Sequence, residues 1–204
     1  CVGGSIGVNN GVLHSCHADA SVNGLSNYVG GLIGANWYAE VVIDCHATGT
    51  VTGNSHVGGL VGDNNETPLI SCSADVTVDA NRPNAYCAGG LAGFYSGSLT
   101  DCHATGGVTG ANQVGGLVGS CTGYEDLISR CYATGDVIAS ESQAGGLVGH
   151  NCGHILESYS TGTVAANGGC AGGLVGNNYY GEVASSHATR SEERRVGKEC
   201  RSRW

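Results

Sequence analysis

The fold is decided by residues 45–62, which read CHATGTVTGNSHVGGLVG. Variants of the second half, GGLVG, recur every 26–31 residues, with the Gly-Gly pair beginning at Gly3, Gly30, Gly58, Gly89, Gly115, Gly145 and Gly172. Variants of the first half recur between them, beginning at Cys16, Cys45, Cys72, Cys102, Cys131, Ser158 and Ser186. Self-similarity at a fixed period of this length is the signature of a repeat architecture, in which each copy is one structural unit.

Within a copy the side chains alternate with a period of two, which is the pattern of a half-buried β-strand. In residues 45–51 we expect Cys45, Ala47 and Val51 to face the core, and His46 and Thr48 to face solvent. Three short strands are predicted in each copy, centred on GGLVG, on the apolar stretch before the Cys, and on ATGxV. The predicted core columns are Cys16, Cys45, Cys72, Cys102 and Cys131, and Val22, Val51, Val78, Val108, Val137 and Val164.

One copy cannot bury its apolar strip alone, but stacked copies can bury it by pairing their strands in parallel. We therefore predict an all-β fold, a parallel β-solenoid (β-helix) of seven coils of about 28 residues, over residues 1–189. At about 4.8 Å per layer the rod would be about 33 Å long. An antiparallel sandwich or propeller is the alternative, but Asn-Gly turns do not recur at a fixed place. One column is expected to form an amide ladder at a corner: Asn9, Asn36, Asn64, Asn151 and Asn178.

The two ends of the chain differ from the repeats between them. Residues 190–204, RSEERRVGKECRSRW, resemble nothing earlier in the sequence. They match the translation of a sequencing adapter whose DNA begins AGATCGGAAGAGC, so we interpret them as a non-native, disordered tail. The alternative is a genuine basic tail that binds an acidic partner. Because the chain starts inside a repeat, we expect it to be an internal, metagenomic fragment of a longer protein without caps at either end.

The charge balance excludes several classes of partner. Of eight Lys and Arg residues, six lie in 190–204, so residues 1–189 keep only Arg82 and Arg130, against fourteen Asp and Glu residues. Such a surface repels nucleic acids and anionic lipids. No apolar stretch approaches the roughly 20 residues that a membrane-spanning helix needs, so we expect no membrane insertion.

The order GGLVG, Asn, an apolar residue and then CxATGxV resembles the bacterial GLUG-motif repeat, and the resemblance covers residues 1–189. That resemblance implies a large secreted or cell-surface protein, of the kind represented by adhesins and IgA-type peptidases. The expected function is a non-catalytic structural or adhesive repeat module located outside the cell or at its surface, with a host glycoprotein or glycan as partner. The alternative is an accessory substrate-binding region of a secreted peptidase that acts on host glycoproteins.

Catalytic and metal-binding motifs are better explained by the repeat. Residues 3–7, GGSIG, fit the nucleophile-elbow pattern, but they are the first GGLVG copy with Ser5 in place of Leu. Adjacent Cys and His residues, such as Cys45 and His46, point to opposite faces of a strand and cannot share a zinc ion. We therefore expect no enzyme activity, no metal site and no cofactor.

The candidate binding residues form an outward column that Ser73 interrupts: His17, His46, His103, Tyr132 and Tyr159. The inward Cys column is expected to hold free thiols, because the last copies carry Ser158 and Ser186 there. Cys121 and Cys152, near equivalent corners of adjacent copies, are the best candidates for a disulfide.

Overall fold

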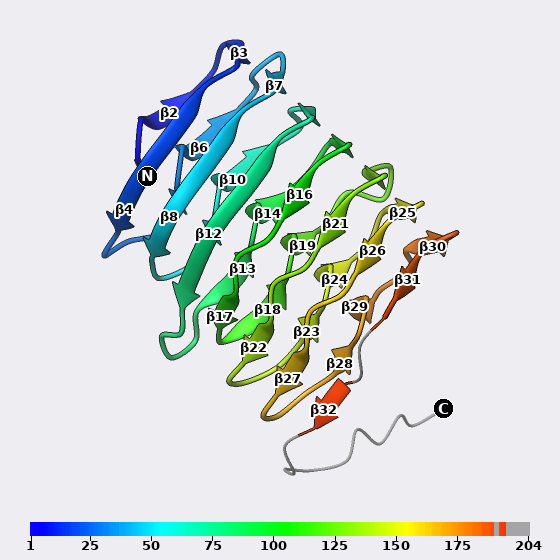
Figure 1. The fold of residues 1–204 in the computed structure, drawn as a ribbon. Coiled ribbons are helices and arrows are strands. Elements are labelled where there is room, and N and C mark those ends of the chain that lie inside the picture. The colour runs from blue at the N-terminus through cyan, green and yellow to red at the C-terminus, as the bar shows by residue number, and fades with distance from the viewer. Residues whose placement is uncertain (190–191, 195–204) are drawn as a thin grey trace.

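The computed structural model describes residues 1–189 and 192–194, and in this part of the chain all regular elements are strands. Three of the sheets have seven strands each, one from every coil, and Figure 1 shows the coils stacked along one axis, from β2 and β4 at one end to β30 and β31 at the other. Every pairing between coils is parallel. The prediction of a parallel β-solenoid with seven coils is therefore confirmed.

Four sheets run along the rod, and each coil contributes to all of them. Sheet A holds the strands that end at the first Gly of each Gly-Gly pair: β1 (Val2–Gly3), β5 (Val29–Gly30), β9 (Val57–Gly58), β13 (Tyr86–Gly89), β18 (Asn112–Gly115), β23 (Ala144–Gly145) and β28 (Ala171–Gly172). Sheet B holds β2 (Ile6–Asn9), β6 (Ile33–Trp37), β10 (Val61–Asn65), β14 (Ala92–Tyr95), β19 (Val118–Cys121), β24 (Val148–Asn151) and β29 (Val175–Asn178).

Sheets C and D complete each coil. Sheet C holds β3 (Leu13–His14), β7 (Val42–Ile43), β11 (Leu69–Ile70), β15 (Ser98–Thr100), β20 (Leu127–Ser129), β25 (His154–Leu156) and β30 (Glu182–Ala184). Sheet D begins with three long strands, β4 (His17–Asn23), β8 (His46–Thr52) and β12 (Ser73–Ala80). In each later coil two short strands take the place of the long one: β16 (His103–Ala104) and β17 (Val108–Gly110), β21 (Tyr132–Ala133) and β22 (Val137–Ala139), β26 (Tyr159–Ser160) and β27 (Val164–Ala166), and β31 (His187–Ala188) and β32 (Glu192–Arg194).

The prediction of three strands per copy is wrong, because GGLVG is not one strand. The chain bends at Gly59 and Leu60, so that Val57–Gly58 joins sheet A and Val61–Asn65 joins sheet B. A Cβ atom on Gly59 would overlap the carbonyl oxygen of Gly90 in the next coil. The Gly-Gly pair is therefore required by the close approach of one bend to the next, which a side chain would prevent.

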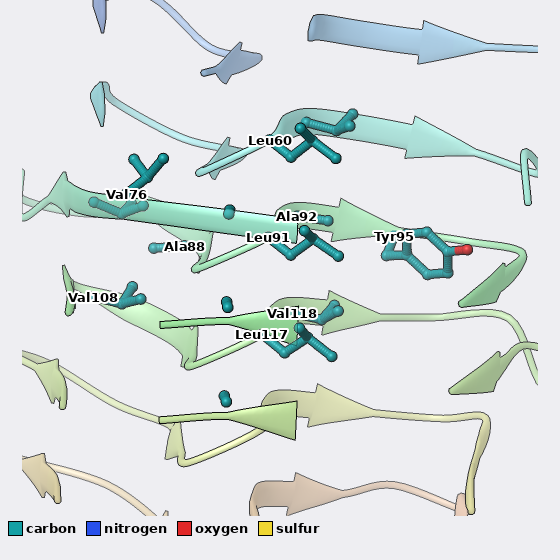
Figure 2. Packing of buried hydrophobic residues seen from close by; sticks show 14 of the residues in the cluster. Leu60, Val76, Ala88, Leu91, Ala92, Tyr95, Val108, Leu117 and Val118 are labelled. Carbon is teal, nitrogen blue, oxygen red and sulfur yellow. The ribbon is translucent and has the colours of Figure 1, made fainter. Parts of the chain in front are cut away.

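The core is a set of columns of identical or similar side chains. Leu32, Leu60, Leu91, Leu117 and Leu147 follow the bend in successive coils, and none exposes more than 1% of its surface. Figure 2 shows three of them, Leu60, Leu91 and Leu117, one above another beside sheet B. Each Leu also donates its N–H to the carbonyl of the next Leu along the rod, as Leu60 does to Leu91 at 2.9 Å. Side-chain packing and backbone pairing thus follow the same period, which locks the register.

The predicted core residues lie inside the coil. Val22, Val51, Val78, Val108, Val137 and Val164 are paired in register along sheet D and expose 0–6% of their surface. Cys45, Cys72, Cys102 and Cys131 are buried, and Cys16, in the first coil, is half-buried. β32 pairs with β27 and continues sheet D. The other residues of the predicted tail, 190–191 and 195–204, lie outside the described residues, so the interpretation of 190–204 stays a prediction.

Candidate binding face

The bend that precedes each sheet D strand sets the direction of the strand's side chains. One residue in every coil takes a left-handed conformation there, with φ between 49° and 55°: Ser15, Asp44, Ser71, Asp101, Arg130, Glu157 and Ser185. Residues other than Gly, Asn and Asp rarely adopt this conformation, which costs them about 1–2 kcal/mol each. The cost is met in all seven coils, because the bend places the next residue, Cys or Ser, over the core.

That Cys or Ser closes the bend with hydrogen bonds in two directions. The thiols of Cys45, Cys72, Cys102 and Cys131 each donate to the carbonyl two residues earlier, at 3.2–3.3 Å. Sulfur also accepts from the neighbouring coil, where the N–H of Cys72 lies 3.3 Å from Sγ of Cys102. The hydroxyl of Ser158 makes both contacts, donating to Leu156 at 2.8 Å and accepting from the N–H of Cys131 at 3.1 Å. The position thus needs a small group that donates and accepts, and a disulfide would remove the donor.

The cysteines of the inward Cys column, together with Cys121 and Cys152, are free thiols. Hydrogen bonds with the thiols of Cys131 and Cys72, followed by burial, hold the pKa of Cys102 well above its usual value. Cys121 and Cys152, the candidates for a disulfide, have different partners: Cys121 donates to Asp126, and Cys152 lies 3.4 Å from Nε2 of His150. Burial raises the pKa of Cys121. A protonated, buried thiol is a poor nucleophile, so we expect Cys102 and Cys121 to be unreactive.

The residue after each Cys or Ser forms the ring column, the outward row of His17, His46, Ser73, His103, Tyr132, Tyr159 and His187. The structure brings all five sequence-predicted binding residues into this row. His17 and His46 stack with ring centroids 5.2 Å apart. Beyond Ser73, four rings stack in one run, with centroid separations of 4.7, 5.1 and 5.6 Å from His103 through Tyr132 and Tyr159 to His187. Within each stacked pair the ring planes lie within 14° of one another.

Polar groups flank the ring column on sheet D. Hydroxyls and carboxylates of adjacent coils pair beside it: Thr48 with Asp19 at 3.0 Å, Thr105 with Asp75 at 2.9 Å, Thr163 with Asp136 at 2.6 Å, and Ser21 with Thr50 at 3.0 Å. At the bend on the other side, Nε and Nη2 of Arg130 donate hydrogen bonds of 2.7 and 2.9 Å to the two carboxylate oxygens of Asp101. A flat surface that combines planar rings with fixed hydroxyls and carboxylates can contact a partner through apolar and polar groups together.

A second aromatic group was missed by the sequence analysis. The carboxylate of Asp63 accepts from Nε1 of Trp37 at 2.8 Å and lies 2.7 Å from Nδ1 of His56. Tyr28 meets both rings edge-on, and Phe94 stacks on His56 with centroids 5.2 Å apart. The five residues come from three columns, because Tyr28 and His56 occupy one column and Asp63 and Phe94 another, and none of these columns keeps one residue type along the rod. The rings and the carboxylate mainly contact one another, which makes this group a local packing unit of coils 2–4.

The other columns explain two further motifs. Asn9, Asn36 and Asn64 form the predicted amide ladder, with Nδ2 to Oδ1 distances of 2.7 Å at both steps. Ser5, at the centre of the elbow-like GGSIG, takes the place of the Leu column, and its N–H donates to the carbonyl of Leu32 at 3.1 Å. Among residues 1–189 and 192–194, no three or more His, Cys, Asp or Glu side chains are arranged to hold a metal ion. The same residues include no helix that could cross a membrane.

These features define a repeat solenoid whose buried columns keep similar side chains from coil to coil. Residues 26–52, 84–109 and 110–138 match the family model described as the GLUG motif, so the chain contains GLUG motif repeats. The chain is also similar to halomucin of Haloquadratum walsbyi, with 38% identity over 145 residues. That similarity covers 62% of this chain but only 2% of the length of halomucin.

Proposed function

We propose that this solenoid is a non-catalytic structural and adhesive repeat module of a secreted or cell-surface protein, and that the ring column is its binding face for a glycan or glycoprotein. The run of four stacked rings on one face carries the proposal, because packing of the core does not require aromatic groups on the outside. The likeness to a protein named halomucin supports a place among surface proteins.

The recurring positions support a non-catalytic role. Each column is used to stack one coil on the next: the Cys or Ser column closes the bend, the Asn column forms an amide ladder, and the Gly-Gly pair admits the neighbouring backbone. A row of groups repeated at each layer suits a long, repetitive partner, since each coil can add a contact. The rings are held by their neighbours, which lowers the entropy that binding would cost.

The test is binding of the whole chain to a panel of immobilised glycoproteins and glycans. Tyr132→Ala combined with Tyr159→Ala removes the centre of the ring run, and we expect affinity to fall by about tenfold or more. Tyr124→Ala is the matched control, because Tyr124 is 61% exposed but lies outside the ring column. Thermal unfolding followed by circular dichroism checks that both variants fold. Equal binding by the double variant and by the control would refute the ring column as the binding face.

A further inference from the structure

Ser73 leaves one position of the ring column without a ring. It pairs in register with His46 in the preceding coil and with His103 in the following one. His46 stacks on His17 on its other side, and His103 stacks on Tyr132 on its other side. Two stacked groups of rings therefore flank a position that carries only a hydroxymethyl group.

The spacing of this position matches one planar group. Successive coils lie about 4.8 Å apart, so His46 and His103 are separated by two layers, or about 10 Å. Rings in adjacent layers of the column have centroids 4.7–5.6 Å apart. A planar group at the level of Ser73 would meet both rings at the spacing found elsewhere in the column. The hydroxyl of Ser73 lies 2.6 Å from Nδ1 of His46, and the residue in register with His103 in coil 3 is Ser73, which has no ring to stack on it.

The charge around Ser73 favours a cation. Asp75 lies two residues further along the same strand, about 7 Å away, where it is exposed, and its Oδ1 accepts a hydrogen bond from Thr105 at 2.9 Å. Burial, then the neighbouring His46, lowers the pKa of His103, so its ring is uncharged at neutral pH. Residues 1–189 hold fourteen acidic residues and two basic ones, and one of these two, Arg130, is already paired with Asp101. The acidic residues therefore attract an incoming cation, and few basic side chains of the chain itself compete with it for them.

We propose that the Ser73 position binds the guanidinium group of an arginine side chain from a protein partner, stacked between His46 and His103 and paired with Asp75. Guanidinium is planar and delocalised, so it stacks on aromatic faces, and its donors match a carboxylate in pairs. The Arg130–Asp101 pair shows the same fork-to-carboxylate geometry within this chain. A lysine ammonium carries equal charge but is not planar, and it would lose the stacking. The site deepens the proposed function, since it lies on the ring column.

The experiment is an NMR titration of the whole chain with the peptide Gly-Arg-Gly and, in parallel, with Gly-Lys-Gly. We expect the His46 and His103 ring signals to shift, and the arginine peptide to bind about fivefold more tightly or better. Ser73→His supplies the missing ring as in the other coils, so the variant should fold with an unchanged or higher melting temperature and lose the preference for arginine. Asp75→Asn should weaken arginine binding, whereas Asp19→Asn, the matched change in the first coil, should not.

Equal affinity for the two peptides, or a preference for arginine that survives in Ser73→His, would overturn the site. The site would also be overturned if Ser73→His abolished binding of a neutral oligosaccharide and left binding of the arginine peptide unchanged. The Tyr132 and Tyr159 double variant reports separately on the ring column as a glycoprotein surface. If the chain shows no preference for arginine but binds glycoprotein through the ring column, only the arginine site fails. If it prefers arginine but the double variant binds glycoprotein as well as the unaltered chain does, only the proposed function fails.

Discussion

The replacement Gly135→Ala tests whether the glycines of sheet D are dictated by space between coils. Gly135 is buried, and a Cβ atom there would overlap the carbonyl oxygen of Gly106 in the preceding coil. The backbone at Gly135 is not left-handed, so conformational strain does not enter the comparison. The neighbouring coils must therefore move apart locally to admit the methyl group.

The expected loss of unfolding free energy follows from the contacts that this movement disturbs. Two hydrogen bonds between coils flank the position, from Thr134 N–H to Ala104 and from Thr161 N–H to Ala133, each 3.0 Å long. Each contributes about 0.5–1.5 kcal/mol, and overpacking itself costs about 1–3 kcal/mol. We expect Gly135→Ala to lower the free energy of unfolding by about 2–6 kcal/mol.

Gly107→Ala is the control, because the nearest atom to a Cβ there is the carbonyl oxygen of Asp136 at 3.6 Å, an ordinary contact. It should leave stability unchanged or raise it by about 0.4–1 kcal/mol, since alanine restricts the unfolded chain. Urea unfolding followed by circular dichroism gives the global effect, and amide hydrogen exchange shows whether coils 4–6 open first. Equal unfolding midpoints for the two variants would refute the spatial argument.

Three further outcomes are expected. Mass spectrometry after iodoacetamide treatment of the folded protein should find exposed Cys1 labelled and buried Cys102 unlabelled; fast labelling of Cys102 would contradict its raised pKa and burial. Ser71→Gly should raise the melting temperature because Ser71 holds a φ of 53°, whereas Thr77→Gly, in the extended part of the same coil, should lower it. His103 has a lowered pKa in the folded state, so its contribution to stability is complete above about pH 6.5 and is lost as the pH falls through the lowered value. His103→Gln should flatten the dependence of the melting temperature on pH below 6.5, and an unchanged dependence would show that burial of this ring is irrelevant.

The repeated sequence carried most of the fold, since identical columns must see identical surroundings. The period of 26–31 residues and the uniform Val22 to Val164 column indicate stacked parallel coils, and Asn36 pairs with its neighbours as its column predicts. The count of strands was missed because a Gly-Gly pair has no side chain that reveals a bend. Only the packed backbone shows that Gly59 faces Gly90.

The candidate site was predicted as a row of residues but not as a surface. The alternation in the sequence places His103, Tyr132 and Tyr159 on one face, because period two is a local property of a strand. Whether the rings stack depends on the exact rise and register between coils, which are long-range quantities. The significance of Ser73 depends in turn on the rings above and below it, so the sequence shows an interruption, and the structure shows a position flanked by two rings.

The sequence by itself determined the period, the strand pattern, the acidic surface and the identity of each column, because these depend on local spacing and on comparison of one copy with another. The tertiary structure decided where the chain bends, which residues take left-handed conformations, and which side chains meet across coils. Arg130 and Glu157 are left-handed at equivalent bends although neither residue type favours that conformation. That choice is made by hydrogen bonds between coils, as in the bond from Asp44 N–H to Ile70, and these exist only once the coils are stacked.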